Sequence, residues 1–292
     1  MTDRFTVIST TPGQVATHSG GTLAARPASP AAGDTYEITS GVGMDDKYTC
    51  FTAGAWTLVA FERDWSPTAP YLEWLLGETS GDYVQSGSAA GGDLALTGSP
   101  TRNVPGFFGG TTTLWTDVSG QYASGAATLT PTASAFTISA WVRPATVAWA
   151  QTIVIKQYAA AGWVDPFASV YLYLQAGGRP RCGVTIAGSL SNLSPGTGET
   201  AVVGQWHHVA MTWDGAGSPK RGLYFDGYLY ASDSPAGTDV DFNALGPWQV
   251  SNGRVAEGML GSVESVRVCN GALTAAQVRE VYQRGEGRYL GQ

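Results

Sequence analysis

The chain has 292 residues, a formal net charge of −7, 13% charged residues and 43% hydrophobic residues. The hydrophobic share excludes a disordered chain, and the scarcity of charge excludes a coiled coil or a helical bundle. The acidic balance argues against nucleic acid and anionic membranes as partners, and no apolar run approaches the roughly 20 residues of a membrane span. The 39 glycines and 11% aromatic residues instead predict an all-β protein with many tight turns.

The N-terminal part of the chain is predicted to contain an arm, a small module and a linker. Residues 1–17 form an extended arm with one short strand around Val7, and residues 18–62 form a small β-rich module. The expected strands of the module are residues 34–38, 48–51 and 56–61. Residues 63–70 contain two prolines and are expected to be a linker, which leaves 71–292 as the main domain.

The main domain is predicted to be an antiparallel β-sandwich. From residue 71 onward, short aromatic-rich strands are separated by Gly, Pro, Asp and Ser. The expected strands are residues 136–143, 151–158, 169–175, 181–187, 205–213, 222–231 and 262–268. No strand alternates with a long helix, which argues against a parallel α/β sheet.

One short C-terminal helix is expected. Thr274 and Gln277 have the spacing of a capping box, and an apolar stripe containing Val278 and Tyr282 follows them. Gly285 is expected to end this helix.

Several blocks of the main domain carry a family resemblance. They are FTISAWVRP (136–144), QWHHVAMTWDG (205–215), LYFDGYLYAS (223–232) and GSVESVRVCNGALTAAQVREVY (261–282). Residues 71–292 thereby resemble the laminin G-like, concanavalin A-like jelly roll family, which implies a two-sheet sandwich. These blocks consist of core aromatics and turn glycines, so they specify the fold more than the function.

The small module carries a second resemblance, in GTLAARPASPAAGDTYEIT (21–39) and GAWTLVA (54–60). These stretches resemble a module near the N-termini of bacteriophage tail-fibre and head-fibre proteins. The combination implies a virion surface protein (a capsid decoration protein, head fibre or tail fibre) that stabilises the capsid, adheres to host glycans, or does both. We expect its N-terminal region to bind major capsid or tail proteins, and we expect a homo-oligomer such as a trimer. The N-terminus shows no secretory signal, so assembly in the host cytoplasm is expected.

The sequence argues against catalysis. It contains no P-loop, no G-x-S-x-G elbow and no H-E-x-x-H pair, and its strands carry almost no alternating carboxylates for glycoside hydrolysis. His207 and His208 are adjacent in a strand, so they point to opposite faces and are expected to be structural. The alternative function is a carbohydrate-binding module of a bacterial surface or glycan-degrading system, which would have a signal peptide or an attached catalytic domain.

The candidate binding residues are few. Trp149 and Trp163 lie beside loop-like stretches, so they are the tryptophans best suited to stack on a sugar, whereas the tryptophans within strands are expected in the core. Calcium is the one cofactor that the sequence suggests. Some members of the resembled family bind calcium at the sandwich rim, and Asp117 and Glu264 stand where such members have acidic residues.

Overall fold

The computed structural model describes residues 7–9, 34–37, 47–52 and 55–60, and then residues 70–290. Gaps in this last stretch fall at 79, 103, 105, 108–113, 117–119, 160–164 and 253–257. The chain divides into two compact units, Met1–Trp65 with Gln283–Gln292, and Ser66–Tyr282.

The first unit contains a four-stranded antiparallel sheet. Its strands, in sheet order, are β1 (Val7–Ser9), β2 (Asp34–Glu37), β3 (Lys47–Thr52) and β4 (Ala55–Ala60). Each lies where the alternation of apolar residues predicted a strand. The domain boundaries at residues 17, 62 and 70 stay predictions.

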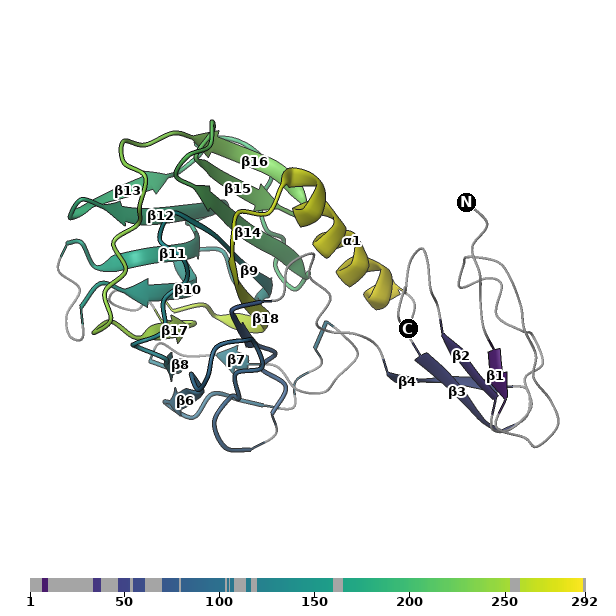
Figure 1. Cartoon of the computed structure of the whole chain (residues 1–292). Coiled ribbons are helices and arrows are strands. Elements are labelled where there is room, and N and C mark those ends of the chain that lie inside the picture. The colour runs from purple at the N-terminus through teal and green to yellow at the C-terminus, as the bar shows by residue number, and fades with distance from the viewer. Residues whose placement is uncertain are drawn as a thin grey trace. The chain divides into compact units, whose positions relative to one another are not determined.

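The second unit is a sandwich of two seven-stranded antiparallel sheets (Figure 1). The first, here called the β11 sheet, has the order β13 (Ser189–Leu193), β12 (Pro180–Ile186), β11 (Ala168–Leu174), β10 (Gln151–Gln157), β17 (Trp248–Val250), β8 (Tyr122–Gly125) and β6 (Leu94–Thr97). The second, here called the β14 sheet, has the order β16 (Tyr228–Asp233), β15 (Arg221–Phe225), β14 (His207–Asp214), β9 (Ala135–Pro144), β18 (Gly261–Asn270) and β5 (Leu72–Trp74), and β7 (Leu114–Thr116) pairs with β18. The predicted all-β, antiparallel sandwich is therefore confirmed.

One hydrophobic core fills the space between the two sheets. Alternate residues of each strand enter it, as Leu172 of β11 and Met211 of β14 do, and both are fully buried. Trp74 and Trp248 meet there with ring centroids 6.1 Å apart, and Trp213 is also fully buried. Trp74, Trp213 and Trp248 are thus core residues, as expected of strand tryptophans, whereas Trp141 of β9 is buried on the outer face of its sheet against Phe107.

The strand expected over residues 222–231 is wrong. Two strands, β15 and β16, occupy this stretch and pair as a hairpin. Asp226 and Gly227 form the turn, with φ of 48° and 78°. An Asp-Gly pair with both φ values positive is typical of the two-residue turn that matches the twist of a hairpin.

The C-terminal helix α1 (Ala275–Leu290) begins as predicted but extends further. The Thr274 amide donates to Gln277 Oε1 at 2.8 Å and the Gln277 amide donates to Thr274 Oγ1 at 3.3 Å, which confirms the capping box. The predicted end at Gly285 is wrong. A glycine inside a helix costs only about 1 kcal/mol relative to alanine, which is too little to end it. α1 is not long and apolar enough to cross a membrane, and the described part of the chain has no other helix.

Candidate functional site

The two outer faces of the sandwich differ, because the protein itself covers much of one of them. The first turns of α1 pack on the β14 sheet, where Val278 lies against Ala210 and Tyr224. Phe107 stacks on Trp141 of the same sheet, with centroids 3.8 Å apart. Figure 1 shows α1 beside β15 and β16, with β10 to β13 on the other side of the sandwich.

The outer face of the β11 sheet carries a ladder of aromatic rings along one strand. Leu172 and Leu174 of β11 enter the core, so Tyr171 and Tyr173 point outward. The Phe167 and Tyr171 rings stack with centroids 5.9 Å apart, and Tyr171 meets Tyr173 edge-on at 5.9 Å. We call Phe167, Tyr171 and Tyr173 the aromatic ladder.

A glycine on the neighbouring strand fixes the position of the central ring. Gly183 of β12 pairs with Tyr171 in the sheet, and a Cβ at Gly183 would lie 2.3 Å from Tyr171 Cε1. The ring therefore lies across β12, where its hydroxyl donates to Asn192 Oδ1 of β13. Tyr171 is only 3% exposed, and this burial raises the pKa of its phenol above the ordinary value, against the opposing effect of the Arg181 charge.

Arg181 of β12 lies beside the ladder. Its guanidinium carbon is 5.8 Å from the Tyr171 ring centroid and 5.9 Å from that of Tyr173. At these distances the cation is attracted to both rings. Its Nε–H is excluded from solvent and has no hydrogen-bond partner in the described part of the chain.

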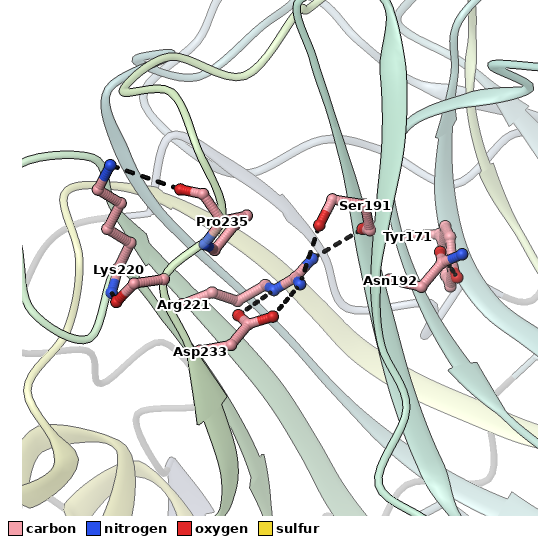
Figure 2. A network of polar contacts seen from close by, with 8 residues as sticks. Tyr171, Ser191, Asn192, Lys220, Arg221, Asp233 and Pro235 are labelled. Atoms are coloured by element: carbon pink, nitrogen blue, oxygen red, sulfur yellow. Dashed lines mark hydrogen bonds and ion pairs between the residues drawn. The ribbon is translucent and has the colours of Figure 1, made fainter.

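A buried arginine holds the edge strand that carries Asn192 (Figure 2). Arg221 of β15 is 0% exposed and pairs with Asp233 of β16, with Nη2 2.5 Å from Oδ2. Its Nη1 donates to the Ser191 carbonyl of β13 at 2.8 Å. This network ties the edge strands of the two sheets together and so supports the position of Asn192.

A pocket of about 440 Å³ opens at the Phe167 end of the ladder. Its lining residues are Asp165, Pro166, Phe167, Gly188, Ser189, Leu190 and Asn192. The lining combines an aromatic ring with a carboxylate, a hydroxyl and an amide. This combination suits a ligand that has both apolar faces and hydroxyl groups.

Trp149 lies elsewhere, on the loop between β9 and β10, and is 47% exposed. Main-chain hydrogen bonds join this loop to two others at the same rim. The Gly177 amide donates to the Val147 carbonyl at 2.7 Å, and the Ala201 amide donates to the Gly178 carbonyl at 2.9 Å. Trp149 therefore belongs to an ordered rim, which follows the Tyr173 end of the ladder because Thr152 of β10 pairs with Tyr173.

The calcium and second tryptophan predictions stay untested, because Asp117 and Trp163 lie outside the described residues. Glu264 of β18 is buried, and its Oε2 accepts the Phe107 main-chain N–H. No group of three His, Cys, Asp or Glu side chains suited to a metal ion occurs among the residues that the structure describes.

The two histidines are joined through one carboxylate. His207 Nδ1 lies 2.8 Å from Asp226 Oδ2, and the His208 main-chain amide donates to Asp226 Oδ1 at 2.8 Å. The Val202 amide donates to His207 Nε2 at 3.0 Å, so both ring nitrogens of His207 are engaged. These contacts anchor the β15–β16 turn to β14, which is a structural arrangement.

The comparisons agree on the fold. Residues 116–279, more than half of the chain, match the family described as the concanavalin A-like lectin/glucanases superfamily. The chain belongs to this superfamily, and its sandwich is the corresponding jelly roll. No curated protein has a matching sequence.

Solved structures with a similar fold include receptor-binding domains of botulinum neurotoxins. The serotype D ligand-binding domain in complex with N-acetylneuraminic acid has a TM-score of 0.55 at 14% identity, covering 74% of this chain and 50% of its own length. The type G receptor-binding domain has a TM-score of 0.52 at 13% identity, covering 74% and 51%. The chain spans about half the length of these structures, and at such identities the likeness concerns the fold alone.

Proposed function

We propose that this protein is a non-catalytic, glycan-binding jelly roll displayed on the surface of a bacteriophage particle. The observation that carries the glycan-binding part is the outer face of the β11 sheet, with its aromatic ladder and adjoining pocket. α1 and Phe107 pack on the opposite outer face, whereas the pocket opens on the β11 sheet.

The chemistry of this face suits a sugar. The apolar face of a pyranose stacks on aromatic rings, and Tyr173 and Phe167 are both partly exposed there. The Asp165 carboxylate accepts hydrogen bonds from sugar hydroxyls, and the Asn192 amide nitrogen donates to them. Because β-strands hold Tyr173 and Asn192, little conformational entropy of these two side chains is lost on binding.

Binding is favoured over hydrolysis because of the carboxylates present. Glycoside hydrolases place two carboxyl groups roughly 5–10 Å apart across the scissile bond. The residues that line the described pocket include one carboxylate, that of Asp165. A ligand held there meets aromatic and polar contacts and a single acid.

The glycan-binding part is tested with a glycan array followed by affinity measurement on the best-binding polysaccharide. Tyr173→Ala is expected to weaken binding about 10-fold, which corresponds to about 1.4 kcal/mol. Tyr228→Ala is the matched control, because Tyr228 is 56% exposed on β16 of the other sheet. Equal affinities of the wild type and Tyr173→Ala would contradict this site.

Trp149 is a second candidate contact, because its exposed indole lies on an ordered rim. Trp149→Ala, measured on the same polysaccharide, separates the two surfaces. A loss with Trp149→Ala and none with Tyr173→Ala would move the glycan site from the β11 sheet to the rim.

The virion part rests on the resemblance of residues 18–62 to phage fibre modules. In this proposal the N-terminal region binds a major capsid or tail protein, and the chain assembles as a homo-oligomer such as a trimer. The jelly roll then reaches the host surface, and bound copies stabilise the particle.

Quantitative mass spectrometry of purified particles tests the location. The protein is expected to co-purify with particles at a fixed ratio to the major capsid protein, and a deletion of residues 1–62 is expected to abolish this. Recovery only outside the particles would contradict display and favour a carbohydrate-binding module of a bacterial system.

A further inference from the structure

The outer face of the β11 sheet carries hydrogen-bond donors on both sides of Tyr171, from Arg181 beside Tyr173 and from Asn192 at the pocket. Arg181 carries five N–H donors and no acceptor. The Asn192 oxygen already accepts the Tyr171 hydroxyl, so its amide nitrogen is left with two donors toward the pocket. A ligand that satisfies this part of the face must therefore supply acceptors.

The charge beside the aromatic ladder is positive, which also favours a ligand that supplies acceptors. The positive charges of Arg181 and Arg221 both lower the pKa of the Tyr171 hydroxyl, against the larger effect of burial. The charge of Arg221 is compensated by Asp233. Arg181 has no ion-pair partner in the described part of the chain, so its charge is uncompensated although the protein as a whole is acidic.

The geometry also orders this cation. A guanidinium beside two tyrosine rings is held in place by attraction to their faces. Its planar edge can then form two parallel hydrogen bonds to a carboxylate or to two oxygens of a phosphate or sulfate. The two terminal nitrogens, Nη1 and Nη2, form such an edge, since the Nε–H is excluded from solvent.

We infer that the glycan bound on the β11 sheet is anionic, with its acidic group paired to Arg181 while a neighbouring sugar ring stacks on Tyr173. This inference rests on the proposed glycan-binding function and adds the chemical class of the ligand. Carboxylate-bearing sugars and sugars carrying sulfate or phosphate share this chemistry.

Polysaccharides with the same backbone and different charge test the inference on the full chain. Polygalacturonate is compared with its fully methyl-esterified form, and dextran sulfate is compared with dextran. The wild type is expected to prefer the charged member of at least one pair about 10-fold, because one charge-assisted hydrogen-bonded pair is involved. The pair that shows the preference identifies the acidic group as carboxylate or sulfate.

Arg181→Gln is expected to reduce this preference to within about twofold, and Arg181→Lys is expected to restore only part of it because the planar edge is lost. Arg279→Gln is the control, since it removes one positive charge from α1, where Arg279 lies over the Tyr228 ring. Thermal unfolding of each variant shows whether it is folded.

The outcomes separate this inference from the proposed function. Equal binding of charged and neutral probes, with a loss in Tyr173→Ala, would overturn the anionic class and leave glycan binding in place. A preference that survives in Arg181→Gln would overturn the role of Arg181. Absence of binding to all four probes and to the glycan array would overturn both.

Discussion

At position 183, only a hydrogen atom separates the main chain of β12 from the Tyr171 ring. Gly183→Ala would place Cβ 2.3 Å from Tyr171 Cε1, so the ring must move and the hydrogen bond to Asn192 is strained. We expect the free energy of unfolding to fall by about 1–3 kcal/mol in chemical denaturation, because overpacking forces side chains off their preferred rotamers.

Gly196→Ala is the control for this substitution. A Cβ at Gly196 meets nothing within 4 Å, and its φ is outside the left-handed region. We expect its stability to stay within about 0.5 kcal/mol of the wild type. Equal effects of the two substitutions would contradict the close packing at Gly183.

The buried side chain of His208 makes the free energy of unfolding depend on pH. Burial lowers the pKa of His208 from 6.5 to about 4, with Asp226 opposing and Arg267 reinforcing the shift. Between these values the unfolded chain takes up a proton that the folded chain does not. The free energy of unfolding therefore falls with decreasing pH, by up to about 1.4 kcal/mol per unit, from about pH 6.5 to 4.

His208→Phe removes this proton uptake, so we expect a shallower slope over the same pH range. Urea denaturation at a series of pH values measures it, and only the slopes of the two proteins are compared. Parallel slopes would mean that His208 does not contribute.

The residues of the candidate site show how far sequence reasoning extends. The alternation in SVYLYLQ puts Tyr171 and Tyr173 opposite the leucines, so this signal was available and was missed in favour of Trp149 and Trp163. The partners of these tyrosines, however, depend on the pairing of β11 with β12 and β13. Register between strands is set by the whole packed sheet, so the contact with Arg181 was not readable from one strand.

Among the elements, β13 is held by a hydrogen bond from Arg221 of the other sheet, and the ion pair with Asp233 positions that arginine. Asp233→Asn leaves the Arg221 guanidinium, which is 0% exposed, without its charge partner. Because the Asp233 side chain is 34% exposed, we expect a moderate loss of about 1–3 kcal/mol. Amide hydrogen exchange in residues 189–193 is expected to accelerate, and the glycan affinity is expected to fall.

Asp239→Asn is the matched control for Asp233→Asn, since Asp239 is exposed and bonded to the neighbouring Thr238 hydroxyl. Unchanged exchange in β13 of Asp233→Asn would show that the ion pair does not hold this strand.

The capping box at the start of helix α1 can be tested by substitution of Thr274. Thr274→Ala removes the acceptor of the Gln277 amide, and we expect a loss of about 1 kcal/mol in thermal or chemical unfolding. Thr274→Ser keeps the hydroxyl and is expected to stay close to the wild type. A similar loss in both variants would contradict the capping role.

The sequence predicted the long strands and the helix start well, because their residue patterns are long or specific. It did not predict the shortest strands. The capping box of α1 and the long strands β9, β10 and β18 lie close to the expected positions. Short strands such as β17 and β13 were missed, because three to five residues carry little periodicity. The Asp226–Gly227 turn was a readable hairpin signal that the continuous apolar pattern around it concealed.

For the whole molecule, the asymmetry of the sandwich links fold to function. α1 and the Phe107 segment cover the outer face of the β14 sheet, whereas the β11 sheet presents aromatic rings, Arg181 and a pocket. The aromatic residues of the chain therefore have two roles. Aromatic residues such as Trp74, Trp213 and Trp248 fill the core, and a few others form the proposed binding face.

Hydroxyl-radical footprinting tests the central claim most directly, with the protein saturated by the best-binding polysaccharide of the array. We expect protection of Phe167 and Tyr173 on the β11 sheet and unchanged labelling of Tyr228 on β16. Protection of Tyr228 without protection of Phe167 and Tyr173 would contradict the assignment of glycan binding to the β11 sheet.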